Sequence, residues 1–237
     1  MRAALAFLTV VPLPRGRSAA PGRAALLAFP LVGALLGLAW AGTAWAAEAA
    51  WGPLAAAGMV VALDLLVTGA LHADAFADVV DGVASGKPAA EAITIMRQPA
   101  IGAVGAAVLV AALLVRFGWI TVLVSNRSWW LLAVVPACGR TAFVWMLARG
   151  SSAPSSLAGG LAAVASVRLG IIVAAEAAVL CALFGRVEGV AAVLLALVVA
   201  EGAHRFWAAR FGGLVGDAVG ACGFLAETAA LGLVSAL

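Results

Sequence analysis

The sequence predicts an all-α integral membrane protein, a polytopic helical bundle that forms one domain over residues 1–237. Three observations predict this fold. Hydrophobic residues make up 65% of the chain and charged residues only 11%, whereas an average soluble domain is about 45–50% apolar and about 25% charged. A soluble protein of this size cannot keep so much apolar surface away from water. The apolar runs also have the length of helices and lack the alternation of a transmembrane β-barrel.

About seven of these runs are expected to cross the membrane, because one crossing takes about 20 apolar residues. The expected spans are 24–47, 53–71, 99–115, 128–148, 169–184, 187–203 and 213–237. The third span extends to Val124 if Arg116 lies within the helix, and Arg140 interrupts the fourth.

The basic residues indicate the orientation of the bundle. Ten of the 14 lie on one side of the predicted topology: Arg2, Arg15, Arg17, Arg23, Lys87, Arg97, Arg149, Arg168, Arg205 and Arg210. The other side has Arg116, Arg127 and Arg186. By the positive-inside rule the first side faces the cytoplasm. We therefore expect a multi-pass protein of the cell (inner) membrane whose polar loops are cytoplasmic. Without a basic run, no nucleic-acid partner is expected.

An Asp-rich segment on the cytoplasmic side is the first candidate site. Three of the five aspartates lie within eight residues, at Asp74, Asp78 and Asp81. Spacings of four and three place them on one face of a helix. Three such carboxylates repel each other, which favours a hard divalent ion such as Mg²⁺ or Mn²⁺ that also binds substrate phosphates. The alternative is a solvated acidic face. His72, beside the cluster, is a candidate acid, base or phosphate ligand, or a cap of the span.

Arg97 and the glycines that follow it form a second candidate. Arg97 stands at the entrance of the third span, before Gly102 and Gly105. A phosphate could bind there, aided by the positive end of the following helix. The alternative is an ordinary interfacial anchor.

The third candidate is Asp217, which follows Gly212 and Gly213 at the entrance of the last span. Glycines allow a ligand or a backbone to approach closely, and an acid in such a position is a functional candidate by default. The same argument applies to Arg140, for which an intramembrane ion pair is the alternative.

Together these segments resemble the cobalamin synthase family, the adenosylcobinamide-GDP ribazoletransferases of vitamin B12 synthesis. Residues 68–82, Thr-Gly-Ala-Leu-His-Ala-Asp-Ala-Phe-Ala-Asp-Val-Val-Asp-Gly, are similar to the family pattern Thr-Gly-Gly-Leu-His-x-Asp-Gly-x-x-Asp-x-x-Asp-Gly. Residues 211–221 resemble Phe-Gly-Gly-x-Thr-Gly-Asp-x-x-Gly-Ala, and the opening residues 7–14 are also family-like. The chain departs from the family at Ala70, Ala75, Val215 and the segment 98–100, Gln-Pro-Ala.

The resemblance implies an enzyme that transfers the phosphocobinamide moiety of adenosylcobinamide-GDP to α-ribazole or its 5′-phosphate. GMP leaves, and adenosylcobalamin or its 5′-phosphate forms. The roles implied for the residues are Mg²⁺ binding by Asp74, Asp78 and Asp81, binding of a second ion or a substrate group by Asp217, charge stabilisation by Arg97 and Arg140, substrate contact at Gly212 and Gly213, and proton acceptance by Asp81 or His72.

Two alternatives belong to other classes. A CDP-alcohol phosphotransferase also uses an aspartate array, but its motif continues with Ala-Arg after the first Asp-Gly, which is absent after Asp74. A cation-coupled transporter would carry its acids near the membrane midplane. The sequence leaves open whether the chain forms a homo-oligomer.

Overall fold

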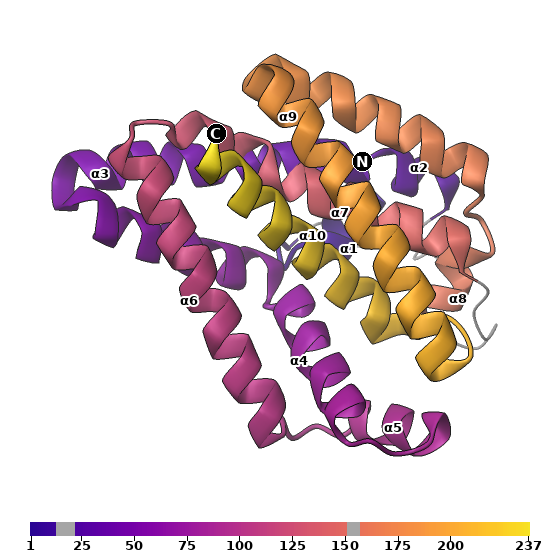
Figure 1. Cartoon of the computed structure of the whole chain (residues 1–237). Helices are drawn as coiled ribbons and strands as arrows, with labels where there is room; N and C mark the ends of the chain where they lie inside the picture. Colours follow the sequence, from indigo (N-terminus) through magenta and orange to yellow (C-terminus); the bar gives the residue numbers. More distant parts are fainter. Residues whose placement is uncertain (13–21, 151–156) are drawn as a thin grey trace.

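A computed structural model describes residues 1–12, 22–150 and 157–237, and its secondary-structure elements are all helices (Figure 1). Arg15, Arg17 and the last two residues of the opening motif, Leu13 and Pro14, lie outside the described residues. The prediction of an all-α bundle is confirmed.

Within the described residues, five helical stretches are long and apolar enough to cross a membrane. They are α3 with the short α2 before it, α6, α7 with the 3₁₀ helix η1 before it, α9 and α10. Their bounds are Arg23–Leu27 (α2), Phe29–Thr68 (α3), Ala103–Ser125 (α6), Trp129–Ala133 (η1), Val135–Arg149 (α7), Val167–Phe211 (α9) and Gly216–Ala236 (α10). The shorter helices are Arg2–Leu8 (α1), Leu71–Ala84 (α4), Ala89–Met96 (α5) and Leu157–Ala162 (α8).

Two predicted loops are replaced by breaks of a single residue. In α3 the break is Gly52, with φ 81°, and in α9 it is Arg186, with φ 47°. Pro53 favours the break in α3, because a proline disfavours the helical conformation of the residue before it. Figure 1 shows both helices doubling back at these points. The described residues therefore contain five long helices, and both breaks fall between expected spans.

Arg116 corrects the predicted topology. The helix α6 continues to Ser125, as in the longer version of the third span, and Arg116 is buried inside it. Arg116 therefore does not belong to a loop on the non-cytoplasmic side.

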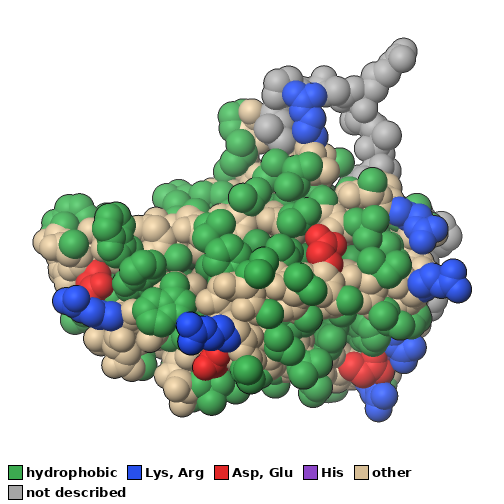
Figure 2. Space-filling model, turned by 90° about the horizontal axis from the view of Figure 1, so that it is seen from above, with side chains coloured by type: hydrophobic (Ala, Val, Ile, Leu, Met, Phe, Trp, Pro, Cys, Tyr) green, Lys and Arg blue, Asp and Glu red, His purple; other side chains and the backbone are tan. Residues whose placement is uncertain are grey.

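The helix α10 lies at the centre of the bundle and contacts α4, α6, α7 and α9. Small residues permit the close packing: Gly220 faces Ala75 of α4, and Gly139 of α7 faces Glu227 of α10. The face shown in Figure 2 is rich in hydrophobic side chains, with few and scattered charges. Such a face suits lipid. The helix α4 packs against α10, α6 and α5.

Candidate functional site

The helix α4 begins at a sharp change of direction after α3. Gly69 and Ala70 both adopt the left-handed conformation, with φ 61° and 55°, and the Ala70 N–H donates to the carbonyl of Leu65 (2.8 Å). Glycine adopts this conformation freely, whereas alanine does so at a cost of about 1 kcal/mol or more. The turn therefore requires two successive left-handed residues, and Ala70 is strained in the second position.

The predicted acidic face exists. All of Asp74, Asp78 and Asp81 lie within α4, and the first turn of α10 adds Asp217. Asp74 and Asp217 line the same cavity, although they are far apart in the sequence. We call Asp74, Asp78 and Asp217 the carboxylate site. Burial and the negative charges of Asp74, Asp217 and Asp81 raise the pKa of Asp78 to about 6. The carboxylates therefore repel one another, as the sequence predicted.

The Asp81 carboxylate, which was expected to bind a metal ion or accept a proton, forms hydrogen bonds with the start of α6. One oxygen accepts a hydrogen bond from the N–H of Gly102 (2.7 Å) and the other from the N–H of Gly105 (2.8 Å). Asp81 thus caps the N-terminus of α6 from a different helix. A Cβ atom at either glycine would overlap the carboxylate. This positive helix end was expected to bind a substrate phosphate, but the structure gives two of its N–H groups to Asp81.

Two cavities adjoin the acidic residues. The first, of about 220 Å³, lies between α1, α4, α7, α8 and α10, and it includes Asp74 and Asp217 in its wall. The second, of about 240 Å³, lies between α4, α5 and α6, and its polar side chains are Asp78, Asp81, Ser85 and Gln98. The acidic residues of α4 therefore line both cavities, Asp74 the largely apolar one and Asp78 and Asp81 the more polar one.

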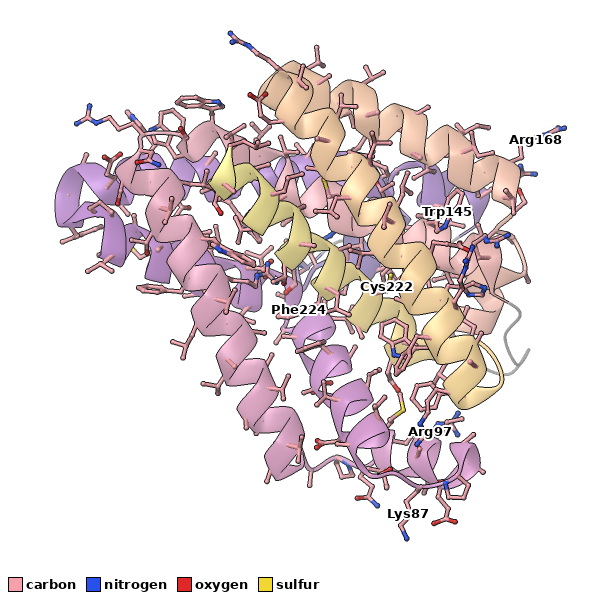
Figure 3. All side chains as sticks on the ribbon, viewed as in Figure 1. Lys87, Arg97, Trp145, Arg168, Cys222 and Phe224 are labelled. Carbon is pink, nitrogen blue, oxygen red and sulfur yellow. The ribbon has the colours of Figure 1, made fainter. Side chains whose placement is uncertain are left out.

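Arg97 is exposed at the end of α5 and lies close enough to Asp217 to interact with its charge. Arg97 and Lys87 are at the same end of the molecule (Figure 3). Arg210 donates to the carbonyl of Lys87 (2.6 Å), which ties the end of α9 to the α4–α5 loop. This end is the one that carries the carboxylate site.

Gly212 and Gly213 connect α9 to α10. Gly212 ends α9 in the left-handed conformation, with φ 75°, so its role in the fold is that of a helix C-cap. Neither glycine is among the residues that line the two cavities. Their predicted contact with substrate stays a prediction.

His72 points into the protein. It is 5% exposed, its ring lies 5.7 Å from that of Phe143, and its Nε2 has no hydrogen-bond partner among the described residues. Burial, followed by the positive charges of Arg140 and Arg116, holds the pKa of His72 well below its usual value. His72 is therefore a neutral imidazole that lines neither cavity, and its predicted catalytic role has no geometric support.

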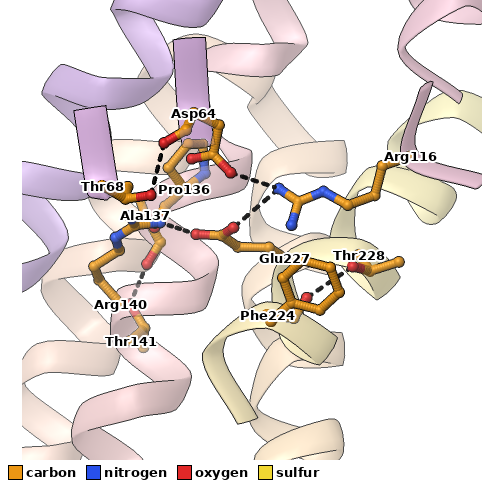
Figure 4. Close-up of polar contacts among 10 residues, drawn as sticks. All are labelled: Asp64, Thr68, Arg116, Pro136, Ala137, Arg140, Thr141, Phe224, Glu227 and Thr228. Carbon is orange, nitrogen blue, oxygen red and sulfur yellow. Dashed lines mark hydrogen bonds and ion pairs between the residues drawn. The ribbon is translucent and has the colours of Figure 1, made fainter. Parts of the chain in front are cut away.

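Arg140 belongs to a buried charge network (Figure 4). It pairs with Glu227, which also accepts from Arg116 (3.1 Å), and Arg116 lies 3.5 Å from Asp64. The four residues come from α3, α6, α7 and α10, and their formal charges cancel. Arg140 is completely buried, so the intramembrane ion pair, the alternative reading of this residue, is the arrangement observed.

The donor set of the carboxylate site suits a hard cation. No three His, Cys, Asp or Glu side chains among the described residues converge enough to form a metal site by themselves. Mg²⁺ needs no such cage, because one or two carboxylates, waters and substrate phosphates complete its octahedron. Burial and, after it, the charges of the neighbouring carboxylates raise the pKa of Asp78, and a cation at this position would relieve the repulsion between the carboxylates. The residues therefore fit Mg²⁺ shared with a phosphorylated substrate.

The sequence motifs did not identify the apolar part of the first cavity. Its wall includes Phe7, Phe143, Leu147 and Leu161, which come from three helices. Phe7 lies in the family-like opening segment, so the sequence weakly indicates that this residue matters for function. The other three lie in ordinary apolar sequence, where only the fold shows that they face a cavity.

Comparison with known proteins gives one consistent result. The sequence model of the cobalamin-5-phosphate synthase family matches residues 1–235. An adenosylcobinamide-GDP ribazoletransferase of Roseiflexus sp. (strain RS-1) is 32% identical, covering 96% of this chain and 86% of the relative. The proteins of the same name from Stutzerimonas stutzeri (strain A1501) and Chlorobaculum tepidum are 35% and 33% identical, covering 96% and 99% of this chain and 94% and 93% of the relatives. No solved structure matches.

Proposed function

The chain belongs to the cobalamin-5-phosphate synthase family, and from this premise we propose how its acidic residues serve the family's reaction. The protein is a transferase of cobalamin biosynthesis. It transfers the phosphocobinamide part of adenosylcobinamide-GDP to α-ribazole or α-ribazole 5′-phosphate, releases GMP and so completes the nucleotide loop. A hydroxyl of the acceptor attacks the phosphate that bears the cobinamide, and the bond between this phosphate and GMP breaks.

The observation that supports this role most directly is that Asp74 of α4 and Asp217 of α10 line one cavity, close enough to Asp78 for their charges to act on it. These residues come from the two family-like motifs, and Asp217 follows Asp78 by 139 residues in the sequence (217 − 78). Two cavities lie beside these residues, which supports a reaction between two substrates.

Asp74, Asp78 and Asp217 are proposed to bind Mg²⁺ jointly with the substrate phosphates, because no three side chains among the described residues form a metal site by themselves. When bound, the ion neutralises charge on the diphosphate and on the leaving GMP. The fit rests on the donor chemistry, since carboxylate oxygens that repel one another are the ligands a hard cation favours. Arg97, exposed and within electrostatic reach of Asp217, would add positive charge at the same end.

Asp81 is proposed to position the site. Both of its oxygens accept hydrogen bonds from α6, so it holds α4 in register with α6 instead of taking a proton from the substrate. The acceptor hydroxyl would lose its proton to Asp74 or Asp78, whose carboxylates accept no hydrogen bond within the described part of the chain.

The carboxylate site is proposed to face the cytoplasm from the inner membrane. Lys87, Arg97 and Arg210 lie at its end of the bundle, whereas Arg127 follows the opposite end of α6. This distribution agrees with the positive-inside rule.

The test is an assay of the purified protein in detergent with adenosylcobinamide-GDP, α-ribazole and Mg²⁺. We expect GMP and a new corrinoid product, both abolished by EDTA and by Asp78→Ala. Glu91→Ala is the matched control, because Glu91 is an exposed carboxylate of the neighbouring α5 that pairs only with the exposed Lys87 in the described structure. Full activity of Asp78→Ala with an unchanged Mg²⁺ requirement would overturn the proposed metal ligands. Absence of product from folded protein would overturn the proposed reaction.

A further inference from the structure

The cavity of about 220 Å³ is lined by both hydrophobic and acidic side chains, and this combination indicates what kind of ligand it binds. We call it the aromatic cavity. Its side chains are mainly hydrophobic and include Phe7, Leu71, Phe143, Leu147, Leu161 and Val219. Asp74 and Asp217 are the polar side chains among its described lining residues. One space therefore combines an aromatic wall with two members of the carboxylate site.

The aromatic wall is held in place by its own packing. The rings of Phe7 and Phe143 lie 5.9 Å apart at 81°, an edge-to-face arrangement, and Phe29 packs against both at 5.8 and 5.6 Å. Such contacts stabilise a fixed geometry. The α1 helix that carries Phe7 is anchored by its fully buried Ala4 and Leu8, and the chain after it is anchored by a hydrogen bond from the Val10 N–H to Val67 (2.8 Å). The cavity is preformed by elements from both ends of the membrane domain's sequence.

The composition of the wall selects the chemistry of the occupant. A purine base such as guanine carries several donors and acceptors, and the hydrophobic side chains would leave them without partners at a cost for each group. A phosphate can lie beside Asp74 and Asp217 only with a cation between them, and the hydrophobic side chains in the rest of the wall offer it no partner. The second cavity, with Ser85, Gln98 and two aspartates, offers polar partners instead. A flat, apolar aromatic group with one polar attachment suits the aromatic cavity.

We infer that the aromatic cavity binds the benzimidazole base of the acceptor nucleoside, with the ribose directed toward Asp74 and Asp217. The inference rests on the proposed function, which supplies the acceptor. It explains how the reacting hydroxyl reaches the carboxylate site while the apolar base is withdrawn from water. Selectivity for an apolar base then arises from exclusion, because a base with polar edges loses its hydrogen bonds to water on entry.

The test compares acceptor kinetics of the unmodified protein with Phe7→Ala and Phe143→Leu. Phe206→Ala is the matched control, since Phe206 is an exposed aromatic residue of α9 outside the aromatic cavity. In Phe7→Ala we expect the KM for α-ribazole to rise roughly 3- to 10-fold, as loss of one aromatic contact predicts. The KM for adenosylcobinamide-GDP stays unchanged. The preference for α-ribazole over the α-riboside of adenine falls by a similar factor.

Three results would overturn the inference: an unchanged KM for α-ribazole in both cavity variants, a rise only in the KM for adenosylcobinamide-GDP, or the same change in Phe206→Ala. Phe7 is half-buried, so Phe7→Ala keeps the test valid if Phe143→Leu does not fold. Equilibrium dialysis of α-ribazole separates the two proposals. Binding that is weakened by Phe7→Ala in a protein without turnover would support the cavity and refute the reaction. Turnover with undisturbed binding in Phe7→Ala would refute the cavity alone.

Discussion

The hydrogen bonds of Asp81 predict that its replacement lowers stability more than the replacement of any residue of the carboxylate site. In Asp81→Ala the N–H groups of Gly102 and Gly105 lose their acceptor, and α4 loses its polar connection to the start of α6. Asp74→Ala is the matched control, because the exposed Asp74 carries the same charge on the same helix face and accepts no hydrogen bond in the described structure.

The magnitude follows from the two bonds. A hydrogen bond to a charged acceptor contributes about 1.5–3 kcal/mol, and loss of a helix cap costs about 0.5–2 kcal/mol. Asp81 is partly exposed, so water can replace part of the loss, and we expect a decrease of about 2–3 kcal/mol in the free energy of unfolding. For a chain of this size that corresponds to a decrease on the order of 5–10 °C in the melting temperature. Asp81→Asn keeps one acceptor oxygen and should lose about half as much.

The measurement is thermal unfolding in detergent, followed by tryptophan fluorescence, together with the GMP-release assay. The expected pattern is a lower melting temperature in Asp81→Ala, an unchanged one in Asp74→Ala, and partial activity in Asp81→Asn at low temperature. If Asp81→Ala melted like the unmodified protein and yet had no activity, Asp81 would be a catalytic residue and the cap would be irrelevant to its role.

Three further predictions concern other parts of the structure. Ala70→Gly should raise the free energy of unfolding by about 1 kcal/mol, because glycine relieves the left-handed strain, whereas Ala73→Gly in the helix should lower it; melting temperatures test both. Arg140→Leu should lower the free energy of unfolding by about 3–5 kcal/mol, because it leaves Glu227 incompletely paired. The double variant Arg140→Leu/Glu227→Leu removes both charges and should recover part of that loss. An equal or larger loss in the double variant would contradict the pairing. Without divalent ions, the free energy of unfolding should fall by about 1 kcal/mol between pH 4 and pH 7. The reason is that burial and the neighbouring carboxylates raise the pKa of Asp78 to about 6, so the folded state binds more protons than the unfolded state in this range. The expected change is small because Asp78 is partly exposed and its charge is screened by solvent. Mg²⁺ should therefore stabilise the protein more at pH 7 than at pH 5, and Asp78→Asn should remove this difference in melting temperature.

The sequence was sufficient for the fold class and for the helical acidic face. Hydrophobic content identified a membrane bundle, and the spacing of Asp74, Asp78 and Asp81 placed them on one helix face, because both features depend on local periodicity. The sequence predicts loops at Gly52 and Arg186, between expected spans, where the structure has breaks of one residue. Composition does not show whether a helix resumes after a single residue.

Contacts between distant segments could not be obtained in this way. The pairing of Arg116 with Glu227 joins residues 111 apart, and the capping of Gly102 by Asp81 joins residues 21 apart. In both cases the sequence identified chemically distinctive residues but not their partners. From the sequence, a charged residue within an apolar run is equally compatible with binding a substrate and with pairing to another buried charge. The packing of α6, α7 and α10 shows that Arg116 and Arg140 pair with a buried charge.

The arrangement explains how repelling carboxylates can be held together in a lipid-facing bundle. Asp81 fixes α4 to α6, Arg116 fixes α6 to Glu227 of α10, and Gly220 lets α10 approach α4 at Ala75. These three contacts form a closed set of helix pairs around the carboxylate site. Glu227 lies ten residues beyond Asp217, about 15 Å along α10, so the charge network fixes the height of this helix without occupying the site. A helix cap and a neutral ion network thus hold the three helices together against the repulsion of the carboxylates, which adds to burial in raising the pKa of Asp78. The stability that offsets this concentration of negative charge comes from contacts outside the reacting centre.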